Sequence, residues 1–197
     1  GNGLGTQGCS LQNISNTKSV DALKNEAAKN IQSGYEAYKK IALSIWDYAE
    51  VGYKENKSST LLQNTLKDNG FKVEAGIAGM PTAFIATYGS GSPVIAILAE
   101  YDALPGLSQE DSPAKSPIAQ RNSGHGCGHN LFGTGSVASG IALKTLMSEG
   151  KIKVTLKVFG CPAEEGGDGN VYMVWEGFFM DVDFVLHWLT EAHIAFF

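Results

Sequence analysis

Two short segments of the chain concentrate side chains that can bind metal ions. In the first, His125, Cys127 and His129 stand within five residues and are separated by glycines, and in the second Glu164 and Glu165 are adjacent. Thiolate, imidazole and carboxylate groups are the usual protein ligands of zinc, manganese and related ions. A carboxylate beside a bound metal can also take a proton from its water. These residue types therefore predict a metal-dependent hydrolase.

Within these segments, Cys127 and His129 are the expected metal ligands, because the flanking glycines allow both to turn toward one point. His125 would crowd the same ion, so we expect it to support the ligands or to contact substrate. Of the two glutamates, one should face the metal and the other its water, and spacing alone leaves open which does which. The alternatives are a glycine-rich turn with a buried cysteine, an acidic turn in solvent, and a Cys–His nucleophilic pair.

Two further residues follow expected strands. Asp102 comes directly after the apolar run of residues 94–99. It either closes a turn, as aspartate often does, or orients a ligand from behind. His187 lies in an apolar segment near the end of the chain and is either a buried core histidine or a further metal ligand.

Hydrophobic periodicity predicts an alternation of helices and strands. We expect helices over residues 19–48, 58–69, 133–147 and 170–178, and strands over 71–74, 82–88, 93–100, 152–159 and 182–188. The Gly-Ser-Gly-Ser link at residues 89–92 suits a hairpin between its flanking strands. The pattern is typical of an α/β fold, a three-layer αβα arrangement around a mostly parallel mixed sheet, with the candidate residues at the carboxyl edge.

The composition is that of a globular protein, with 43% hydrophobic and 18% charged residues. A net charge of -5 gives no reason to expect nucleic acid as a partner, and no apolar run is long enough to span a membrane. Three cysteines argue against a disulfide framework. We expect the cytoplasm as the compartment. An extracytoplasmic lipoprotein modified at Cys9 is the alternative, since the chain does not begin with Met.

Three ordered motifs resemble the M20 metallopeptidases, in particular the amidohydrolase branch that includes aminobenzoyl-glutamate utilization proteins. They are IAILAEYDALPGL at residues 95–107, GHGCGHNLFG at 124–133 and GCPAEEGGDG at 160–169. The likeness is continuous from about residue 35 to residue 186.

The resemblance implies a zinc- or manganese-dependent hydrolase of a small amide, such as an N-acyl or aminobenzoyl amino acid or a dipeptide. It implies that Cys127, His129 and Glu165 bind metal, that Glu164 is the general base, and that Asp102 orients the catalytic groups. His187 fits one register of a further histidine ligand in the family. Members of the family also form homo- or hetero-oligomers.

The composition of the N-terminal residues and the resemblance together imply a division of the chain. We expect a disordered tail over residues 1–17, a partial catalytic domain over 18–188, and an atypical tail over 189–197. We expect the dimerisation domain of the family to be absent from these residues. The alternative function is therefore a catalytically incomplete fragment that binds a metal or a partner chain. Such a portion should leave apolar faces of the sheet and helices uncovered.

Overall fold

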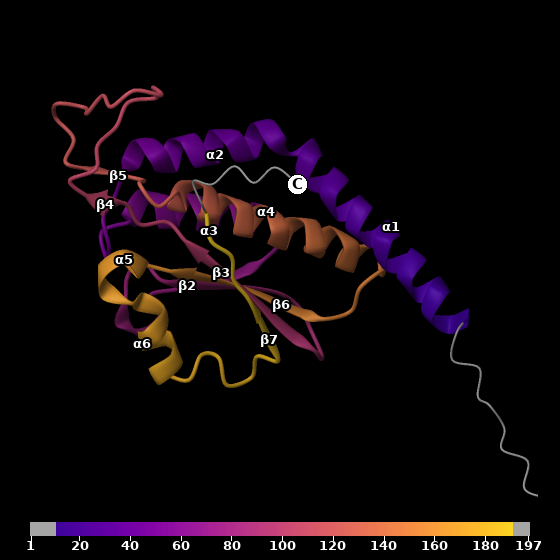
Figure 1. Cartoon of the computed structure of the whole chain (residues 1–197). Coiled ribbons are helices and arrows are strands. Elements are labelled where there is room, and N and C mark those ends of the chain that lie inside the picture. Colours follow the sequence, from indigo (N-terminus) through magenta and orange to yellow (C-terminus); the bar gives the residue numbers. More distant parts are fainter. Residues whose placement is uncertain (1–10, 191–197) are drawn as a thin grey trace, which may run out of the picture.

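The computed structural model describes the backbone of residues 11–190 and the side chains of residues 19–190 (Figure 1). The helices are α1 (Leu11–Ser33), α2 (Tyr35–Tyr48), α3 (Asn56–Asp68), α4 (His129–Ser148), α5 (Glu164–Gly167) and α6 (Gly169–Trp175), with a 3-10 turn η1 (Ile77–Gly79). The strands are β1 (Lys72–Ala75), β2 (Phe84–Gly89), β3 (Val94–Glu100), β4 (Leu104–Pro105), β5 (Ser123–Gly124), β6 (Thr155–Cys161) and β7 (Phe184–Leu186).

Five strands form the main sheet in the order β1-β2-β6-β3-β7. The β1/β2 and β2/β6 pairs are antiparallel, whereas β3 pairs in parallel with both β6 and β7. The predicted mixed sheet of an αβα fold is thus confirmed. The predicted hairpin is wrong, because β6 lies between β2 and β3. The apolar strand β3 needs hydrogen-bonding neighbours on both edges, and the parallel strands β6 and β7 supply them.

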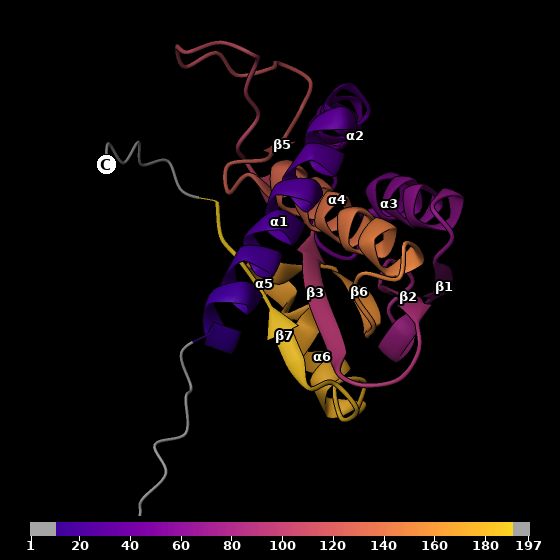
Figure 2. The same ribbon diagram turned by 90° about the vertical axis from the view of Figure 1, so that its right-hand side faces the viewer.

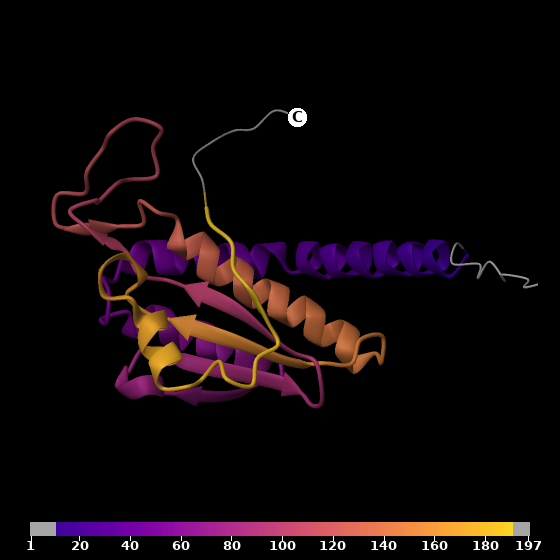
Figure 3. The same ribbon diagram turned by 60° about the horizontal axis from the view of Figure 1, so that its bottom comes forward.

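Helices cover both faces of this sheet (Figure 2). On one face, α3 and α4 pack through residues such as Leu66 and Ile141 against Leu156 of β6. On the other face, Phe159 of β6 packs with Met173 of α6. Alternate residues along β6 therefore belong to the hydrophobic cores on opposite faces of the sheet, because successive side chains of a strand point to opposite sides. Helix α1 packs against α4 and extends past the sheet (Figure 3).

The helix boundaries differ from the prediction at the N-terminal end. The helix expected over residues 19–48 is divided at Gly34 into α1 and α2. Helix α1 begins at Leu11, so it includes residues 11–17 of the expected tail, and residues 1–10 lie outside the described part of the chain. Residues 191–197 of the other expected tail also lie outside it. Periodicity locates helices more securely than it locates their ends.

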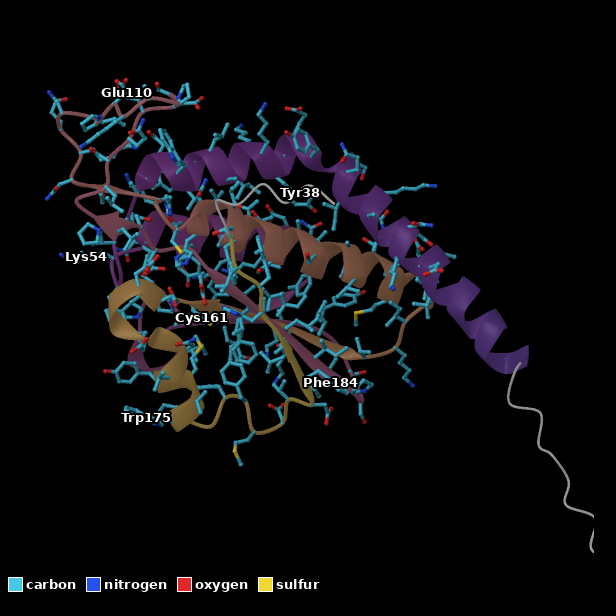
Figure 4. All side chains as sticks on the ribbon, in the orientation of Figure 1. Tyr38, Lys54, Glu110, Cys161, Trp175 and Phe184 are labelled. Atoms are coloured by element: carbon cyan, nitrogen blue, oxygen red, sulfur yellow. The ribbon has the colours of Figure 1, made fainter. Side chains whose placement is uncertain are left out.

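Large apolar side chains are exposed around α6 and β7. Trp175, Met180 and Phe184 are 75%, 88% and 60% exposed, and Trp175 and Phe184 mark the two ends of this region in Figure 4. Strand β7 pairs only with β3 among the described residues. This agrees with the expectation of uncovered apolar surface. No described helix combines the length and apolar character needed to cross a bilayer.

The core between the sheet and α3 should dominate stability. Leu66 is fully buried there, so Leu66→Ala should lower the free energy of unfolding by about 2–5 kcal/mol. Leu131 is 56% exposed, and Leu131→Ala should change that free energy by less than about 0.5 kcal/mol. Urea unfolding followed by circular dichroism measures both. Equal losses in the two variants would contradict this assignment of the core.

Candidate metal centre

The candidate residues meet at the carboxyl edge of the parallel strands. Strand β3 ends at Glu100, which lies opposite Cys161 at the end of β6. Asp102 follows β3, and helix α4 begins at His129 beside it. Helix α5 follows β6 and begins with the two adjacent glutamates. The predicted gathering of the site at this edge is therefore what the structure shows, with the two glutamates on the one-turn helix α5.

Two glycines shape the segment before α4. One lets its backbone pass close to Leu107, and the other makes the turn into the helix. A Cβ atom at Gly124 would lie 1.7 Å from the carbonyl oxygen of Leu107, so this position has no room for a side chain. Gly128 has a φ of 74° and precedes the first residue of α4. Only glycine adopts this left-handed conformation without steric cost, and the resulting turn places His129 at the start of the helix.

His129 is the centre of the cluster and is 2% exposed. Its Nδ1 lies 2.7 Å from Oδ1 of Asp102. Because the carboxylate accepts, Nδ1–H donates this bond and Nε2 keeps its lone pair in the neutral imidazole. Nε2 faces three further carboxylates, at 3.4 Å from Glu100 Oε2, 3.7 Å from Glu164 Oε2 and 3.8 Å from Glu165 Oε1.

Two of these carboxylate oxygens lack the partners that burial requires. Oε2 of Glu100 and Oε1 of Glu165 are buried and accept no hydrogen bond among the described residues. Unpaired buried oxygens of this kind are costly unless a cation neutralises them. Ligand atoms of Cys127, His129 and Glu165 lie within 4.8 Å of one another, and so do those of Glu100, His129 and Glu164. The donor set and its unpaired oxygens fit a divalent cation.

The protonation equilibria reflect the same excess of negative charge. Burial, followed by the nearby Glu165, raises the pKa of the Cys127 thiol to about 11. Burial and the neighbouring Glu100 raise the pKa of Glu164. Burial alone would lower the pKa of His129, but the hydrogen bond to Asp102 and the surrounding carboxylates outweigh it and raise that pKa. Each shift favours the protonated form of its group, which carries less negative or more positive charge. A bound cation would supply positive charge in place of these protons.

The two other histidines whose side chains the structure describes, His125 and His187, lie outside both groups of candidate ligands. Nε2 of His125 lies 3.0 Å from the carbonyl oxygen of Ile45 in α2, and burial lowers the pKa of His125 to about 4. His125 therefore links the loop to α2. Nε2 of His187 lies 2.9 Å from Oε1 of Glu100, and its ring packs 5.2 Å from that of Phe132. His187 thus reaches the cluster through Glu100.

Sequence reasoning missed Glu100 as a member of the cluster. It is fully buried and lies between His129 and His187. Its position at the end of an apolar strand, two residues before Asp102, was an available signal, because residues i and i+2 of an extended chain point to the same side. Its contact with His187 depends on the pairing of β7 with β3, which spacing along the chain does not give.

Known proteins with similar sequences are hydrolases by name. The chain is 44% identical over 168 residues to a subunit of the p-aminobenzoyl-glutamate hydrolase of Escherichia coli (strain K12), a match that covers 85% of this chain and 35% of that protein. It is 30% identical over 189 residues to the Xaa-Arg dipeptidase of Mus musculus, covering 88% of this chain and 40% of the relative. The chain thus spans about a third to two-fifths of the length of these relatives.

Solved structures share the fold at low sequence identity. A putative aminohydrolase from methicillin-resistant Staphylococcus aureus superposes with a TM-score of 0.69 at 23% identity, covering 82% of this chain and 41% of that one. A Bacillus subtilis protein described as a dinuclear metal binding peptidase from the M20 family gives a TM-score of 0.67 at 22% identity, covering 78% and 42%. These structures support the αβα architecture.

The family model of peptidase family M20/M25/M40 matches residues 96–195, half of the chain. The matched range runs from the middle of β3 onward and contains all of the carboxylates, the thiol and the imidazoles described above. Together with the relatives and the shared fold, this match shows that the chain belongs to peptidase family M20/M25/M40.

Proposed function

We propose that this chain carries the metal-binding catalytic site of an amidohydrolase that cleaves the amide bond of an N-acyl or aminobenzoyl amino acid or of a dipeptide. The observation that carries the proposal is the buried cluster around His129, in which carboxylate oxygens lack partners. The names of the relatives support an aminobenzoyl-glutamate or a dipeptide as substrate.

Cys127, His129 and Glu165 would hold a divalent ion, with Glu100 and Glu164 beside it. Thiolate and imidazole ligands favour zinc, and the number of carboxylates also suits manganese. When bound, such an ion polarises a carbonyl oxygen and makes its water more acidic. The Bacillus subtilis structure described as dinuclear supports more than one ion at this edge of the sheet.

Glu164 has the properties of a proton carrier. Its side chain is 37% exposed, so substrate and water can reach it, while its Oε2 still lies 3.7 Å from His129 Nε2. Burial and Glu100 raise its pKa. A carboxyl group with a raised pKa can take a proton from water and return it to a leaving nitrogen. We assign Glu164 this role.

Asp102 orients two of the proposed ligands through hydrogen bonds. One of its oxygens accepts from His129 Nδ1, and the other accepts from the backbone N–H of Glu165 at 3.0 Å. A single carboxylate thereby fixes the tautomer of the imidazole and the position of the glutamate turn.

The geometry argues against a nucleophilic Cys–His pair. Nucleophilic cysteines need a lowered pKa, usually beside a cation. Carboxylates surround Cys127 instead, and its pKa is raised to about 11. The thiol is therefore better suited to bind a metal than to attack a carbonyl in the metal-free protein.

The first test concerns metal binding. Cys127→Ala should weaken zinc affinity by more than about 100-fold, because losing a direct ligand should exceed the cost of losing an outer-shell partner. Cys161→Ala is the control, since that thiol is buried in the core and belongs to neither group of candidate ligands. Competition titration with a zinc chelator measures both. Equal affinities in wild type and Cys127→Ala would contradict the proposed ligand.

The second test concerns proton transfer. Glu164→Gln should lower kcat for p-aminobenzoyl-glutamate or an Xaa-Arg dipeptide by roughly 10²- to 10⁴-fold, with zinc content unchanged. The exposed Glu176, changed to Gln, is the matched control. Full activity in Glu164→Gln would assign the proton transfer elsewhere. A zinc-loaded wild-type chain that hydrolyses none of these substrates would favour the alternative of a metal-binding remnant.

The third test concerns the orientation of His129. Asparagine at position 102 has one acceptor oxygen for two donors, so Asp102→Asn should lower zinc affinity about 10- to 100-fold. Asp181→Asn is the control, because Asp181 only pairs with Lys157 at the surface. Zinc affinity in Asp102→Asn that equals the affinity of this control would show that the bond to Asp102 does not organise the site.

A further inference from the structure

A second buried carboxylate lies directly behind the turn that carries Glu164 and Glu165. Glu55 is fully buried and has no cationic partner among the described side chains. Its Oε1 accepts from the backbone N–H of Ala163 at 2.8 Å, and its Oε2 accepts from the hydroxyl of Thr82 at 3.0 Å. Burial raises the pKa of the Glu55 carboxyl, and these hydrogen bonds act in the opposite direction. The buried carboxylate thus accepts hydrogen bonds from two other segments of the chain.

The helix that follows Glu55 does not need this side chain. Glu55 occupies the N-cap position of α3 but makes no side-chain cap bond. Glu50 accepts from the first turn instead, at 2.9 Å from the N–H of Lys57 and 2.8 Å from that of Ser58. Because Glu50 satisfies the helix terminus, the carboxylate of Glu55 is available for contacts on the other side of the chain.

The residue that Glu55 holds has an unfavourable backbone conformation. Ala163 has a φ of 55° and a ψ of 40°, the left-handed region that residues with a Cβ avoid. Such a conformation persists only where the surroundings fix it. Here the N–H of Ala163 is held by Glu55, and two positions later the N–H of Glu165 is held by Asp102. The turn is therefore fixed at two backbone groups by two buried carboxylates from different elements.

The other end of the Glu55 network is fixed as well. The carbonyl oxygen of Thr82 accepts from the hydroxyl of Ser59 at 2.8 Å and from that of Tyr101 at 2.6 Å. Ser59 lies on α3, and Tyr101 immediately precedes Asp102. Thr82 is thereby held between α3 and the end of β3, and its own hydroxyl presents a fixed donor to Glu55.

From this geometry we propose that Glu55 is a positioning residue for the metal centre. By holding the N–H of Ala163, it sets the direction in which Glu164 and Glu165 project toward His129. The role requires an acceptor at this position and does not require its charge. This inference rests on the proposed metal site and adds a residue that is more than 100 positions away from the turn along the chain.

The experiment uses Co²⁺ alone as the probe, since its thiolate charge-transfer and d–d absorption bands report the geometry of Cys127 and its neighbours. Glu55→Met keeps the volume but has no strong acceptor, so Co²⁺ affinity should fall about 10- to 100-fold and the d–d bands should change. Glu55→Gln keeps an acceptor for Ala163 and should retain affinity within about threefold, with the wild-type spectrum.

Glu50→Gln is the matched control, because it weakens the cap of α3 without touching Ala163. It should lower the melting temperature and leave the Co²⁺ spectrum unchanged. If Glu55→Met binds Co²⁺ with wild-type affinity and spectrum, Glu55 has no positioning role. A folded Glu55→Gln variant that loses the wild-type spectrum would equally contradict a role through hydrogen bonds alone.

Circular dichroism establishes that each variant is folded. Should Glu55→Met fail to fold, Thr82→Val decides, since it removes only the donor that orients Glu55; an unchanged Co²⁺ spectrum in that variant would overturn the proposal. A wild-type chain that binds no Co²⁺ would overturn the metal site itself and the role of Glu55 with it. If wild type binds Co²⁺ and the variants keep its affinity and spectrum, only the role of Glu55 is overturned.

Discussion

Carboxylates crowd around one buried imidazole, and much of the surrounding structure is arranged to make this possible. Glu100, Glu164 and Glu165 face Nε2 of His129 while Asp102 holds its Nδ1. Charges interact more strongly in a protein interior than in water, so like charges at these distances repel one another unless a cation is present. The fold therefore bears an electrostatic cost at the carboxyl edge of its sheet, and a bound divalent ion would relieve it.

Backbone N–H groups and short rigid elements keep this arrangement in place. Asp102 joins the start of α4 to the glutamate turn through two hydrogen bonds, and Glu55 joins the same turn to the start of α3. The turn thus depends on contacts among three segments that are distant in sequence. This explains why a left-handed alanine is tolerated at position 163: the bonds to its own N–H and to the N–H of Glu165 offset the strain.

Glu100 gives the cluster a further connection. It contacts His129 with one oxygen and His187 with the other, so the last described strand reaches the site through a carboxylate. The ring of His187 also packs on Phe132 of α4, which stacks on Trp188 at 4.6 Å. The position of β7 and the geometry of the metal centre are therefore coupled, in a region where the neighbouring apolar side chains are exposed.

The sequence by itself predicted the αβα class, most of the elements and the meeting of Cys127, His129, Glu164, Glu165 and Asp102. These follow from local information: periodicity marks helices and strands, glycines mark tight turns, and ligand types at strand ends mark one edge of a parallel sheet. The hairpin expected at residues 89–92 was wrong, because β6, a strand much later in the chain, lies between β2 and β3 and pairs with both.

Only the tertiary structure decided which side chains support the site. Glu55 and Glu100 are ordinary glutamates in the sequence, and their roles depend on contacts with Ala163 and His187 that bridge 108 and 87 positions. His125, which has the same residue type and nearly the same place as His129, bonds instead to a carbonyl of α2. Residue types and their spacing along the chain predict which chemistry the site can perform. The direction of each side chain depends on backbone conformation and on packing between distant elements, which spacing does not contain.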